Sequence, residues 1–322
     1  MTLSHTSPHT STQEATAFVA ILRLLQQQAY QFTTISPTSH ALVNSRPGNE
    51  LAKNVADILG WSRPFTADVA GYELFALLKQ ATALSFDGTV WHSRLRVSSL
   101  SGRLFLHSAF PTSESDAIFF GPDTYRFSRA ITQYLALHQP HVRRAVDIGC
   151  GSGVGAILLA AQLPQAQVYG VDINHQALVI ASANGTASDL LNLHWQHSNL
   201  LQALEGEFDL IIANPPYLVD ASERAYRHGG GVLGADLSLQ IVQTAKERLA
   251  AGGTLLLYTG VAIVNGKDIF LQELQSMLRG SALQYEYQEM DPDIFGEELR
   301  SPAYIQADRL AAVVLTLHKS PS

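Results

Sequence analysis

The hydrophobic positions of this chain follow one spacing in its first part and another in its second. Up to residue 80 they recur at helical spacing in three runs: Ala17–Leu25, Asn49–Leu59 and Tyr72–Lys79. Two short runs, 95–100 and 103–107, then flank the turn pair Ser101-Gly102, which is typical of a β-hairpin. The first part is therefore predicted to be helical and to end in a hairpin.

From residue 127 onward, strand-like runs alternate with helix-like runs. Strands are expected near 145–149, 168–172, 193–197, 208–213, 254–259, 283–289 and 310–318, and helices near 127–138, 155–163, 175–185, 235–250 and 268–279. This alternation predicts an α/β fold with a seven-stranded, mostly parallel sheet and right-handed crossovers. Only an irregular linker joins the last two strands, so the last strand is expected to be antiparallel.

These patterns divide the chain into three parts. Residues 1–14 are rich in Ser and Thr and are expected to be a disordered tail. Residues 15–118 are expected to form a helical and hairpin domain, for substrate recognition or for oligomerisation, and a role in stability alone stays open. Residues 119–322 are expected to form the α/β domain.

A glycine-rich turn follows the first strand of the α/β domain. The strand Ala145–Ile148 leads into Gly149-Cys-Gly-Ser-Gly153, and a helix-like run begins at Ala156. Glycines in such a turn allow positive φ and a close approach of backbone to a ligand, and the helix that follows presents free N–H groups. Asp147 lies at the end of this strand. A phosphate-binding loop would gain nothing from a carboxylate there, so Asp147 argues against such a loop. A second strand ends in Asp172, 19 residues after Gly153, close to the offset at which an acid takes ribose hydroxyls.

The tetrapeptide Asn214-Pro-Pro-Tyr217 follows the strand-like run 208–213. Its two prolines lack backbone donors and have a fixed φ, so the segment cannot continue the strand. The Asn214 amide and the Pro215 carbonyl are then available as acceptors for a planar amide or amino nitrogen. Asn214 is expected to orient the substrate and Tyr217, after Pro216, to form a packing wall.

Taken together, these three segments resemble the class I S-adenosylmethionine-dependent methyltransferases, which have a Rossmann-like fold. The resemblance covers roughly residues 120–320. It implies S-adenosyl-L-methionine as the cofactor, with Asp147 and the glycines at its methionine end and Asp172 at its ribose. Asn199 stands where many relatives have an acid that contacts adenine. The residues expected to bind the cofactor are Asp147, Gly149, Gly151, Gly153, Asp172, Ile173, Asn199, Asn214 and Thr124.

Within that superfamily, Asn-Pro-Pro-Tyr resembles the methyltransferases that act on planar nitrogens. The segment Phe119–Tyr125 is similar to an Arg-Pro-Asp/Glu-Thr-Glu segment of the glutamine N5-methyltransferases of release factors and a ribosomal protein. It has Gly121 and Tyr125 where that group has Arg and Glu. The stretch Gly229–Leu237 is similar to a glycine-rich helix entry in the same group. The resemblance implies N-methylation of a protein glutamine, with a small-molecule N-methyltransferase and an rRNA, tRNA or DNA amino-group methyltransferase as alternatives.

The distribution of charge along the chain bears on which of these substrates is favoured. The net charge is −7; residues 1–130 hold 10 Lys and Arg against 9 Asp and Glu, whereas residues 131–322 hold 11 against 19. Proteins that grip nucleic acid normally present a basic patch. A nucleic-acid substrate is therefore less favoured than a protein or a small molecule.

Composition indicates a globular protein of the cytoplasm. Hydrophobic residues make up 46% and charged residues 15%, and no apolar run is long enough to cross a bilayer. The N-terminus lacks the basic and then apolar layout of a signal peptide. The single cysteine, Cys150, excludes an internal disulfide, which fits a reducing compartment. The oligomeric state stays open.

No other chemistry is indicated by the sequence. The 12 histidines show no ligand-like pairing, so no metal site is expected. The linker 291–304 is long for a connection inside a compact domain, which predicts a functional segment. Its four acids, Asp291, Asp293, Glu297 and Glu298, suggest a lid that favours neutral or basic substrates, with a solvated acidic loop as the alternative.

Overall fold

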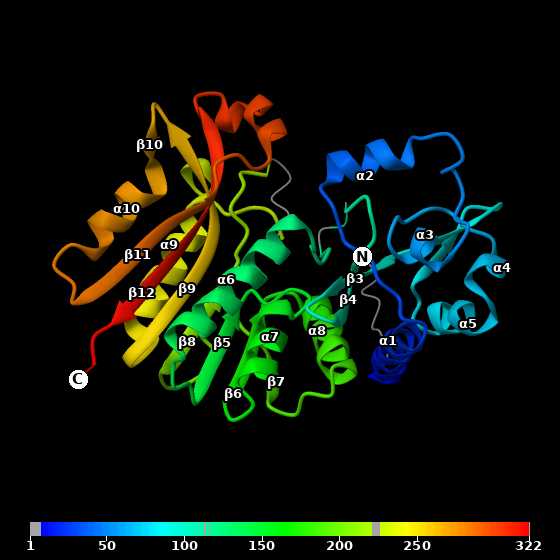
Figure 1. Cartoon of the computed structure of the whole chain (residues 1–322), viewed down its shortest axis with the longest axis horizontal. Helices are drawn as coiled ribbons and strands as arrows, with labels where there is room; N and C mark the ends of the chain where they lie inside the picture. Colours follow the sequence, from blue (N-terminus) through cyan, green and yellow to red (C-terminus); the bar gives the residue numbers. More distant parts are fainter. Residues whose placement is uncertain (1–7, 113, 115, 221–225, 322) are drawn as a thin grey trace, which may run out of the picture. The chain divides into compact units, whose positions relative to one another are not determined.

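The structure is a computed structural model, and it describes residues 8–112, 114, 116–220 and 226–321 (Figure 1). These residues form two compact units. The first contains the chain up to Tyr125 together with Gly151–Val154 and Gln176–Leu190. The second contains Arg126–Cys150, Gly155–His175 and the chain from Leu191 onward. Two stretches from the middle of the chain thus belong to the N-terminal unit.

The second unit is built on one sheet. Its strands are β5 (Arg144–Ile148), β6 (Gln167–Asp172), β7 (Leu193–His197), β8 (Phe208–Ala213), β9 (Leu249–Val264), β10 (Lys267–Asp268), β11 (Leu283–Asp291) and β12 (Arg309–Lys319). The order across the sheet is β11-β12-β9-β8-β5-β6-β7, and β10 pairs with β9. In this order, the neighbouring strands β9, β8, β5, β6 and β7 pair in parallel. β12 is antiparallel to both β9 and β11.

The helices of this unit are those that the alternating pattern predicts. They are α6 (Pro122–His138, from Arg126 onward), α7 (Val154–Gln162), α9 (Asp236–Arg248) and α10 (Ile269–Leu278). Apolar side chains of α9 and α10, including Ile241, Phe270 and Leu274, are buried with those of β8, β9 and β12. The long buried runs of β9 and β12 have such side chains on both faces, as expected of central strands.

The predicted fold class is confirmed, including the antiparallel last strand. Two boundaries differ from those expected. The helix near 235–250 ends at Arg248, because the chain turns extended at Leu249 and the strand expected near 254–259 begins there. β11 is parallel to β9, since both are antiparallel to β12, so the linker 291–304 leaves the sheet at the carboxyl ends of the parallel strands.

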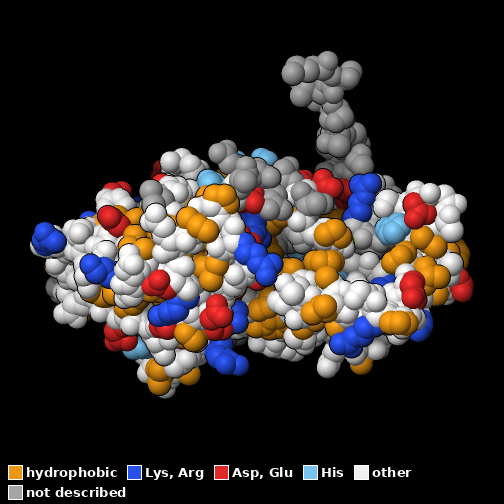
Figure 2. Space-filling view, turned by 90° about the horizontal axis from the view of Figure 1, so that it is seen from above, with side chains coloured by type: hydrophobic (Ala, Val, Ile, Leu, Met, Phe, Trp, Pro, Cys, Tyr) orange, Lys and Arg blue, Asp and Glu red, His pale blue; other side chains and the backbone are white. Residues whose placement is uncertain are grey.

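Charged side chains of both signs are mixed on the molecular face drawn in Figure 2. Among the described residues of that face, Lys and Arg side chains lie singly or in small groups between acidic and hydrophobic ones. No continuous basic band crosses this part of the surface.

The first unit contains short helices and two hairpins. Its elements are α1 (Pro8–Gln27), α2 (Pro37–Asn44), α3 (Val55–Leu59), α4 (Ala67–Ala70), α5 (Tyr72–Gln80), β1 (Leu84–Phe86), β2 (Trp91–Ser93), β3 (Leu95–Leu100) and β4 (Arg103–Ser108), with α8 (His175–Ala187) from the middle of the chain. α1 begins at Pro8, before the boundary at residue 15, and residues 1–7 of the expected tail lie outside the described residues.

The helix expected over 49–59 is shorter than predicted. It begins only after Asn54, whose side chain accepts a hydrogen bond from the Asp57 amide at 2.9 Å and so acts as the N-cap. Gly60 is the C-cap. The sequence analysis missed α2, α4 and the hairpin of β1 and β2, which are too short to show a period.

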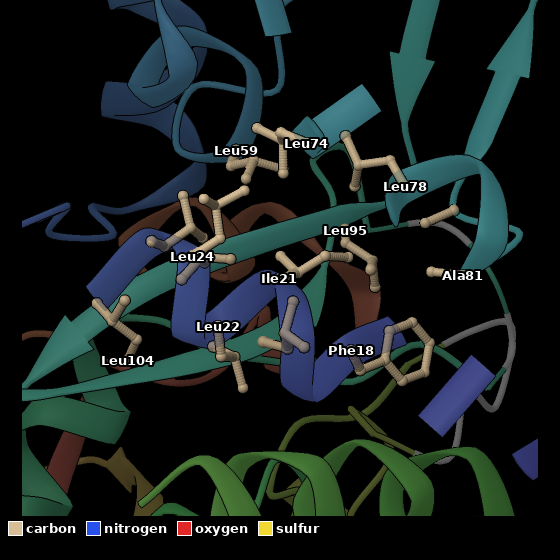
Figure 3. Packing of buried hydrophobic residues seen from close by; sticks show 14 of the residues in the cluster. Phe18, Ile21, Leu22, Leu24, Leu59, Leu74, Leu78, Ala81, Leu95 and Leu104 are labelled. Carbon is tan, nitrogen blue, oxygen red and sulfur yellow. The ribbon is translucent and has the colours of Figure 1, made fainter. Parts of the chain in front are cut away.

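One apolar core joins α1, α5 and the hairpin of β3 and β4 (Figure 3). Phe18, Ile21 and Leu22 from α1 lie in the same buried cluster as Leu74 and Leu78 from α5. The cluster also contains four residues of α8, namely Ala177, Ile180, Ala183 and Ala187. α8 is therefore part of the core of the N-terminal unit.

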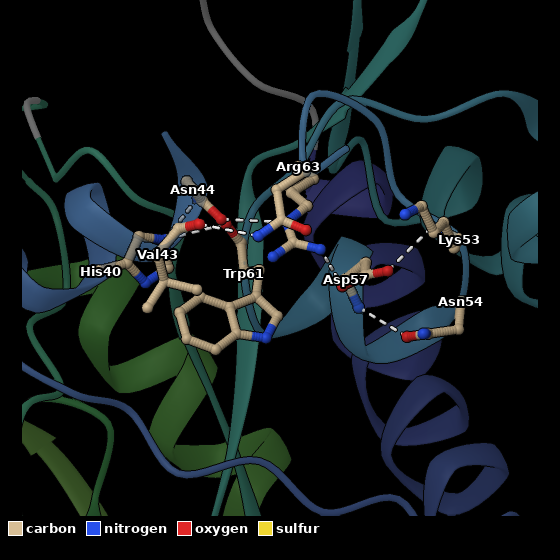
Figure 4. A network of polar contacts seen from close by, with 9 residues as sticks. His40, Val43, Asn44, Lys53, Asn54, Asp57, Trp61 and Arg63 are labelled. Atoms are coloured by element: carbon tan, nitrogen blue, oxygen red, sulfur yellow. Dashed lines mark hydrogen bonds and ion pairs between the residues drawn. The ribbon is translucent and has the colours of Figure 1, made fainter. Parts of the chain in front are cut away.

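A polar network lies beside this core (Figure 4). The guanidinium of Arg63 donates to Asn44 Oδ1 at 3.0 Å and to Asp57 Oδ1 at 2.6 Å. Asn44 Nδ2 and His40 Nε2 both lie within hydrogen-bond distance of the Trp61 carbonyl, at 2.8 and 2.9 Å. Through Arg63, these contacts connect α2, which contains Asn44, to α3, which contains Asp57.

Candidate active site

The candidate site residues of the second unit lie at the carboxyl ends of four adjacent strands. Ile148 of β5 is in register with Ala213 of β8 on one side and with Val171 of β6 on the other. Gly149, Asn214 and Asp172 therefore follow the strands at the same level of the sheet. Adjacent strands are about 4.8 Å apart, so Asn214 and Asp172 flank the glycine turn at a backbone separation of roughly 10 Å. This edge is where open α/β sheets bind ligands.

The glycine turn is held to the neighbouring strand by its backbone. The amides of Gly149 and Cys150 both donate to the Val171 carbonyl, at 2.9 and 3.0 Å. Gly149, Gly151 and Gly153 have φ of +68°, +52° and +82°, which side chains rarely adopt. A Cβ placed on Gly149 or Gly151 would meet no heavy atom within 4 Å. The turn therefore borders open space that a ligand can occupy.

Asp147 is used inside the protein. Its side chain is buried, and its Oδ2 accepts a hydrogen bond from the Ala156 amide at 3.0 Å, at the start of α7. Burial raises the pKa of this carboxyl to about 8, opposed by the Ala156 hydrogen bond and supported by the charge of Asp172. Asp147 thus connects the end of β5 with the first turn of α7. Its contact with a cofactor remains a prediction.

The end of β6 combines a carboxylate with an exposed apolar side chain. Asp172 Oδ1 accepts a hydrogen bond from the Asn174 amide at 2.9 Å, and Ile173 is 54% exposed. His197 Nε2 donates to the Ile173 carbonyl at 3.0 Å, and its ring stacks on His175 with centroids 4.0 Å apart. An acceptor beside an apolar surface suits a ligand that has hydroxyls next to a flat base. Asn199 is exposed just beyond β7.

Asn214 is half-buried at the end of β8, and Pro215 after it is buried. Within the part of the chain that the structure describes, no group hydrogen-bonds to the Asn214 amide. A side-chain amide in such a position loses hydration without gaining an internal partner, so it is available to a ligand.

Tyr217 is packed into the protein by two sets of contacts. Its ring lies on the backbone of Gly260 in β9, so close that a Cβ there would stand 2.3 Å from a ring atom, and it meets Phe295 at 6.2 Å between centroids. Its backbone lies against Gly229 and Gly234, where a Cβ would also clash. Glycines are therefore required on both sides of Tyr217.

The linker Asp291–Tyr304 is folded against the segment that follows Asn-Pro-Pro-Tyr. It forms two 3-10 turns, η2 (Gly296–Arg300) and η3 (Pro302–Tyr304), and Tyr304 is buried. The Tyr304 hydroxyl accepts a hydrogen bond from the Val219 amide at 2.9 Å. Arg227 forms an ion pair with Glu298 in η2 and lies 3.6 Å from the Asp220 carboxylate.

These contacts change the expected role of the four acids in the linker. Asp291 is paired with Arg126 at 2.7 Å, and Glu298 with Arg227. Only Asp293 and Glu297 are exposed. Two of the four acids are therefore paired with arginines of the same chain. That the linker is a lid favouring neutral or basic substrates stays a prediction.

Thr124 and the segment around it belong to the first unit. Thr124 Oγ1 accepts a hydrogen bond from the Gly121 amide at 3.2 Å, and the Tyr125 hydroxyl accepts one from the Thr34 amide at 3.0 Å. Phe120 stacks on His107 with centroids 4.8 Å apart. Gly151 and Gly153 also belong to this unit. The expected contact of Thr124 with the cofactor remains a prediction.

Sequence reasoning missed three residues around the Asn-Pro-Pro-Tyr segment: Arg227, Gly260 and Tyr304. Arg227 and Tyr304 lie 13 and 90 positions from Asn214, and no local pattern marks them. Gly260 lies within the buried run of β9, and a glycine inside a strand signals a close approach of another group.

Two kinds of feature are absent from the described ranges. No group of three or more His, Cys, Asp or Glu side chains could hold a metal ion. Of the helices that the structure describes, none is long and apolar enough to cross a membrane.

Residues 127–263 match the family model of the methyltransferase small domain. This match covers β5 to β9 with the glycine turn, Asp172 and Asn-Pro-Pro-Tyr, so this part of the chain is similar to methyltransferase small domains. The match confirms the predicted resemblance to the methyltransferases, whose cofactor is S-adenosylmethionine.

Two of the similar curated proteins are glutamine methyltransferases. The release factor glutamine methyltransferase of Deinococcus radiodurans is 31% identical over 176 residues, which is 51% of this chain and 62% of that protein. The ribosomal protein uL3 glutamine methyltransferase of Bordetella pertussis is 40% identical over 131 residues, 37% of this chain and 44% of that protein. The matches span less than two thirds of either relative.

Among solved structures, the tRNA m1G37 methyltransferase of M. jannaschii has a TM-score of 0.48 at 15% identity, over 71% of this chain and 58% of that one. So distant a likeness carries nothing for the function.

Proposed function

We propose that this protein transfers the methyl group of S-adenosylmethionine to the side-chain amide nitrogen of a glutamine in a protein. The observation that carries the proposal is the side-chain amide of Asn214 at the end of β8, beside the glycine turn at the end of β5, to which no described residue hydrogen-bonds. The similarity to glutamine methyltransferases of a release factor and of a ribosomal protein supports it.

The residues present fit the cofactor. Gly149, Gly151 and Gly153 would border its methionine end, because a Cβ on Gly149 or Gly151 would meet no heavy atom within 4 Å. Asp172 would accept from the ribose hydroxyls, and Ile173 and Asn199 would contact the adenine. When bound, S-adenosylmethionine supplies an electrophilic methyl group on a sulfonium.

The chain's own groups would hold the glutamine nitrogen. An amide nitrogen is a poor nucleophile, since its lone pair is delocalised into the carbonyl. Asn214 Oδ1 and the Pro215 carbonyl would accept the two N–H groups and favour the pyramidal nitrogen that develops positive charge. Pro216 would fix the backbone between Pro215 and Tyr217. The packed ring of Tyr217 would keep the segment in place. The rate of methyl transfer would then come from the orientation of the glutamine nitrogen more than from acid–base catalysis.

Two alternatives share this chemistry. A small-molecule amine or amide would need the same acceptors and no protein-binding surface. A nucleic-acid amino group is disfavoured by the acidic second part of the chain and by the absence of a basic band on the described part of the face in Figure 2. We propose the cytoplasm as the location, since release factors and ribosomal proteins act there. We also propose that residues 15–118 recognise the substrate.

The proposal is tested by methyl transfer from labelled S-adenosylmethionine to purified, unmethylated release factor and uL3, followed by mass spectrometry of the modified residue. We expect one methyl group on a glutamine side chain. Asn214→Ala should abolish transfer while its affinity for S-adenosylhomocysteine stays within a few fold of wild type.

Label that appears only in the RNA or small-molecule fraction of a lysate would favour an alternative substrate. If calorimetry detects no binding of S-adenosylhomocysteine to the wild-type protein, the proposed methyltransferase activity itself is contradicted. A loss in Asn214→Ala that affects only KM would mean that this residue binds substrate without stabilising the transition state.

A further inference from the structure

One buried side chain, Asn184 on α8, joins two backbone segments far apart in sequence. Its Oδ1 accepts a hydrogen bond from the Leu106 amide at 2.8 Å, and its Nδ2 donates to the Leu106 carbonyl at 3.1 Å. Nδ2 also donates to the Ser152 carbonyl at 2.8 Å. Asn184 is 0% exposed, so water does not compete for these groups. All three residues belong to the first unit.

Towards Leu106, Asn184 replaces a strand. β4 pairs only with β3 among the described strands, so its other edge presents free backbone groups. The carboxamide of Asn184 supplies one acceptor and one donor to the amide and carbonyl of the same residue, as a neighbouring strand would. The hairpin is thereby fixed to α8.

Towards Ser152, Asn184 holds the glycine turn. Ser152 lies between Gly151 and Gly153, which have φ of +52° and +82° and, as glycines, can adopt many backbone conformations. Ser152 is itself buried, and a buried carbonyl without a donor destabilises the folded chain. The Asn184 donor therefore selects one conformation of the turn.

We propose that Asn184 is a positioning residue for cofactor binding, and that it couples the glycine turn to the β3–β4 hairpin. The inference rests on the proposed use of S-adenosylmethionine. Without the Asn184 amide, the turn populates conformations that do not accept the cofactor, and part of the binding free energy is spent on ordering it. Because coupling is reciprocal, cofactor binding also stabilises the backbone of the hairpin.

Asn192 offers a matched control. Its Nδ2 donates to three backbone carbonyls, those of Ala160, Leu163 and Ala166, at 3.0 to 3.2 Å. Truncation of Asn192 to alanine therefore removes a set of hydrogen bonds similar to that of Asn184. These hydrogen bonds lie at the end of α7 and not at the glycine turn. Comparison of Asn184→Ala with Asn192→Ala separates positioning of the turn from a general loss of stability.

The experiment is calorimetry of the full chain with S-adenosylhomocysteine, at a temperature where circular dichroism shows both variants to be folded. We expect about tenfold weaker binding for Asn184→Ala and a change within twofold for Asn192→Ala. Hydrogen exchange supplies a second measurement. S-adenosylhomocysteine should slow exchange of the β4 amides in wild type but not in Asn184→Ala.

Equal affinity of the two alanine variants would overturn the proposal and leave the use of S-adenosylmethionine intact. Wild-type protein that binds no S-adenosylhomocysteine would overturn both. If Asn184→Ala does not fold, Asn184→Asp takes its place, because it keeps the acceptor for the Leu106 amide and the side-chain volume. The same loss of affinity is expected there, and wild-type affinity would again contradict the inference.

Discussion

The hydroxyl of Tyr304 accepts a hydrogen bond from the backbone amide of Val219 at 2.9 Å. Tyr304 ends the turn η3 in the linker between β11 and β12, whereas Val219 comes two residues after the Asn-Pro-Pro-Tyr segment. This contact is accompanied by the Arg227–Glu298 ion pair and by the rings of Tyr217 and Phe295. The linker is thus attached to the candidate catalytic segment at three places.

Tyr304→Phe should slow methyl transfer about fivefold and speed hydrogen exchange at Val219. The substitution keeps the buried ring and removes one hydrogen bond, which contributes about 1 kcal/mol. Tyr287→Phe is the control, because the Tyr287 hydroxyl donates to Asp268 at 2.6 Å, at the start of α10. If both variants retain wild-type turnover and Val219 exchange, the linker does not position the segment.

Gly260→Ala should abolish turnover with little change in the affinity for S-adenosylhomocysteine. A Cβ at this position would stand 2.3 Å from a ring atom of Tyr217, so the ring has to move. Gly266→Ala is the control for stability, since its φ of +70° makes any side chain costly while a Cβ there would meet nothing within 4 Å. A Gly260→Ala enzyme as active as Gly266→Ala would show that the position of Tyr217 is unimportant.

Asp147→Asn should remove part of the pH dependence of folding. With a folded pKa of about 8, well above that of an ordinary aspartate, the native state binds this proton more tightly than the unfolded chain. The stabilising contribution of the protonated form is therefore present at low pH and is lost as pH rises towards 8. Urea unfolding at pH 5 and pH 8.5 measures the difference between wild type and Asp147→Asn. A difference that does not change with pH would mean that the Asp147 pKa is not raised.

Glu298→Gln should lower the free energy of unfolding by about 1 kcal/mol, because it leaves Arg227 with a weaker partner in a half-buried place. Its neighbour provides the control, since Glu297 is exposed and Glu297→Gln should stay within about 0.5 kcal/mol of wild type. Thermal and urea denaturation measure both. Equal effects would place the two acids together in a solvated loop.

Asp172→Ala should weaken binding of S-adenosylhomocysteine by about 1–3 kcal/mol, since the ribose hydroxyls lose a charged acceptor. Calorimetry measures this, with Asp209→Ala as a control in the same sheet. Asp209 accepts hydrogen bonds from the backbone amides of Arg143 and Arg144 at 2.9 Å, at the opposite end of β5. A larger loss of affinity in the control than in Asp172→Ala would contradict the assignment of the ribose site.

The sequence alone determined the α/β fold of the second unit. Strands such as 208–213 and helices such as 236–248 are continuous in the chain, and their apolar spacing follows from the geometry of each element. It also predicted the class of the site, because Asp172 ends a strand, and the glycine turn and Asn214 each follow directly after one. The ends of adjacent parallel strands meet at one edge of the sheet, so these residues could be grouped without coordinates.

Only the tertiary structure decided what holds that site in place. Asp147 caps α7, Tyr304 fastens the segment after Tyr217, and Asn184 fixes Ser152 to β4. The acids of the linker have different roles for the same reason, since Arg126 and Arg227 pair with two of them. These partners lie up to 165 residues apart along the chain. A local pattern reports the period of an element, whereas a contact between distant side chains exists only once the elements have packed together.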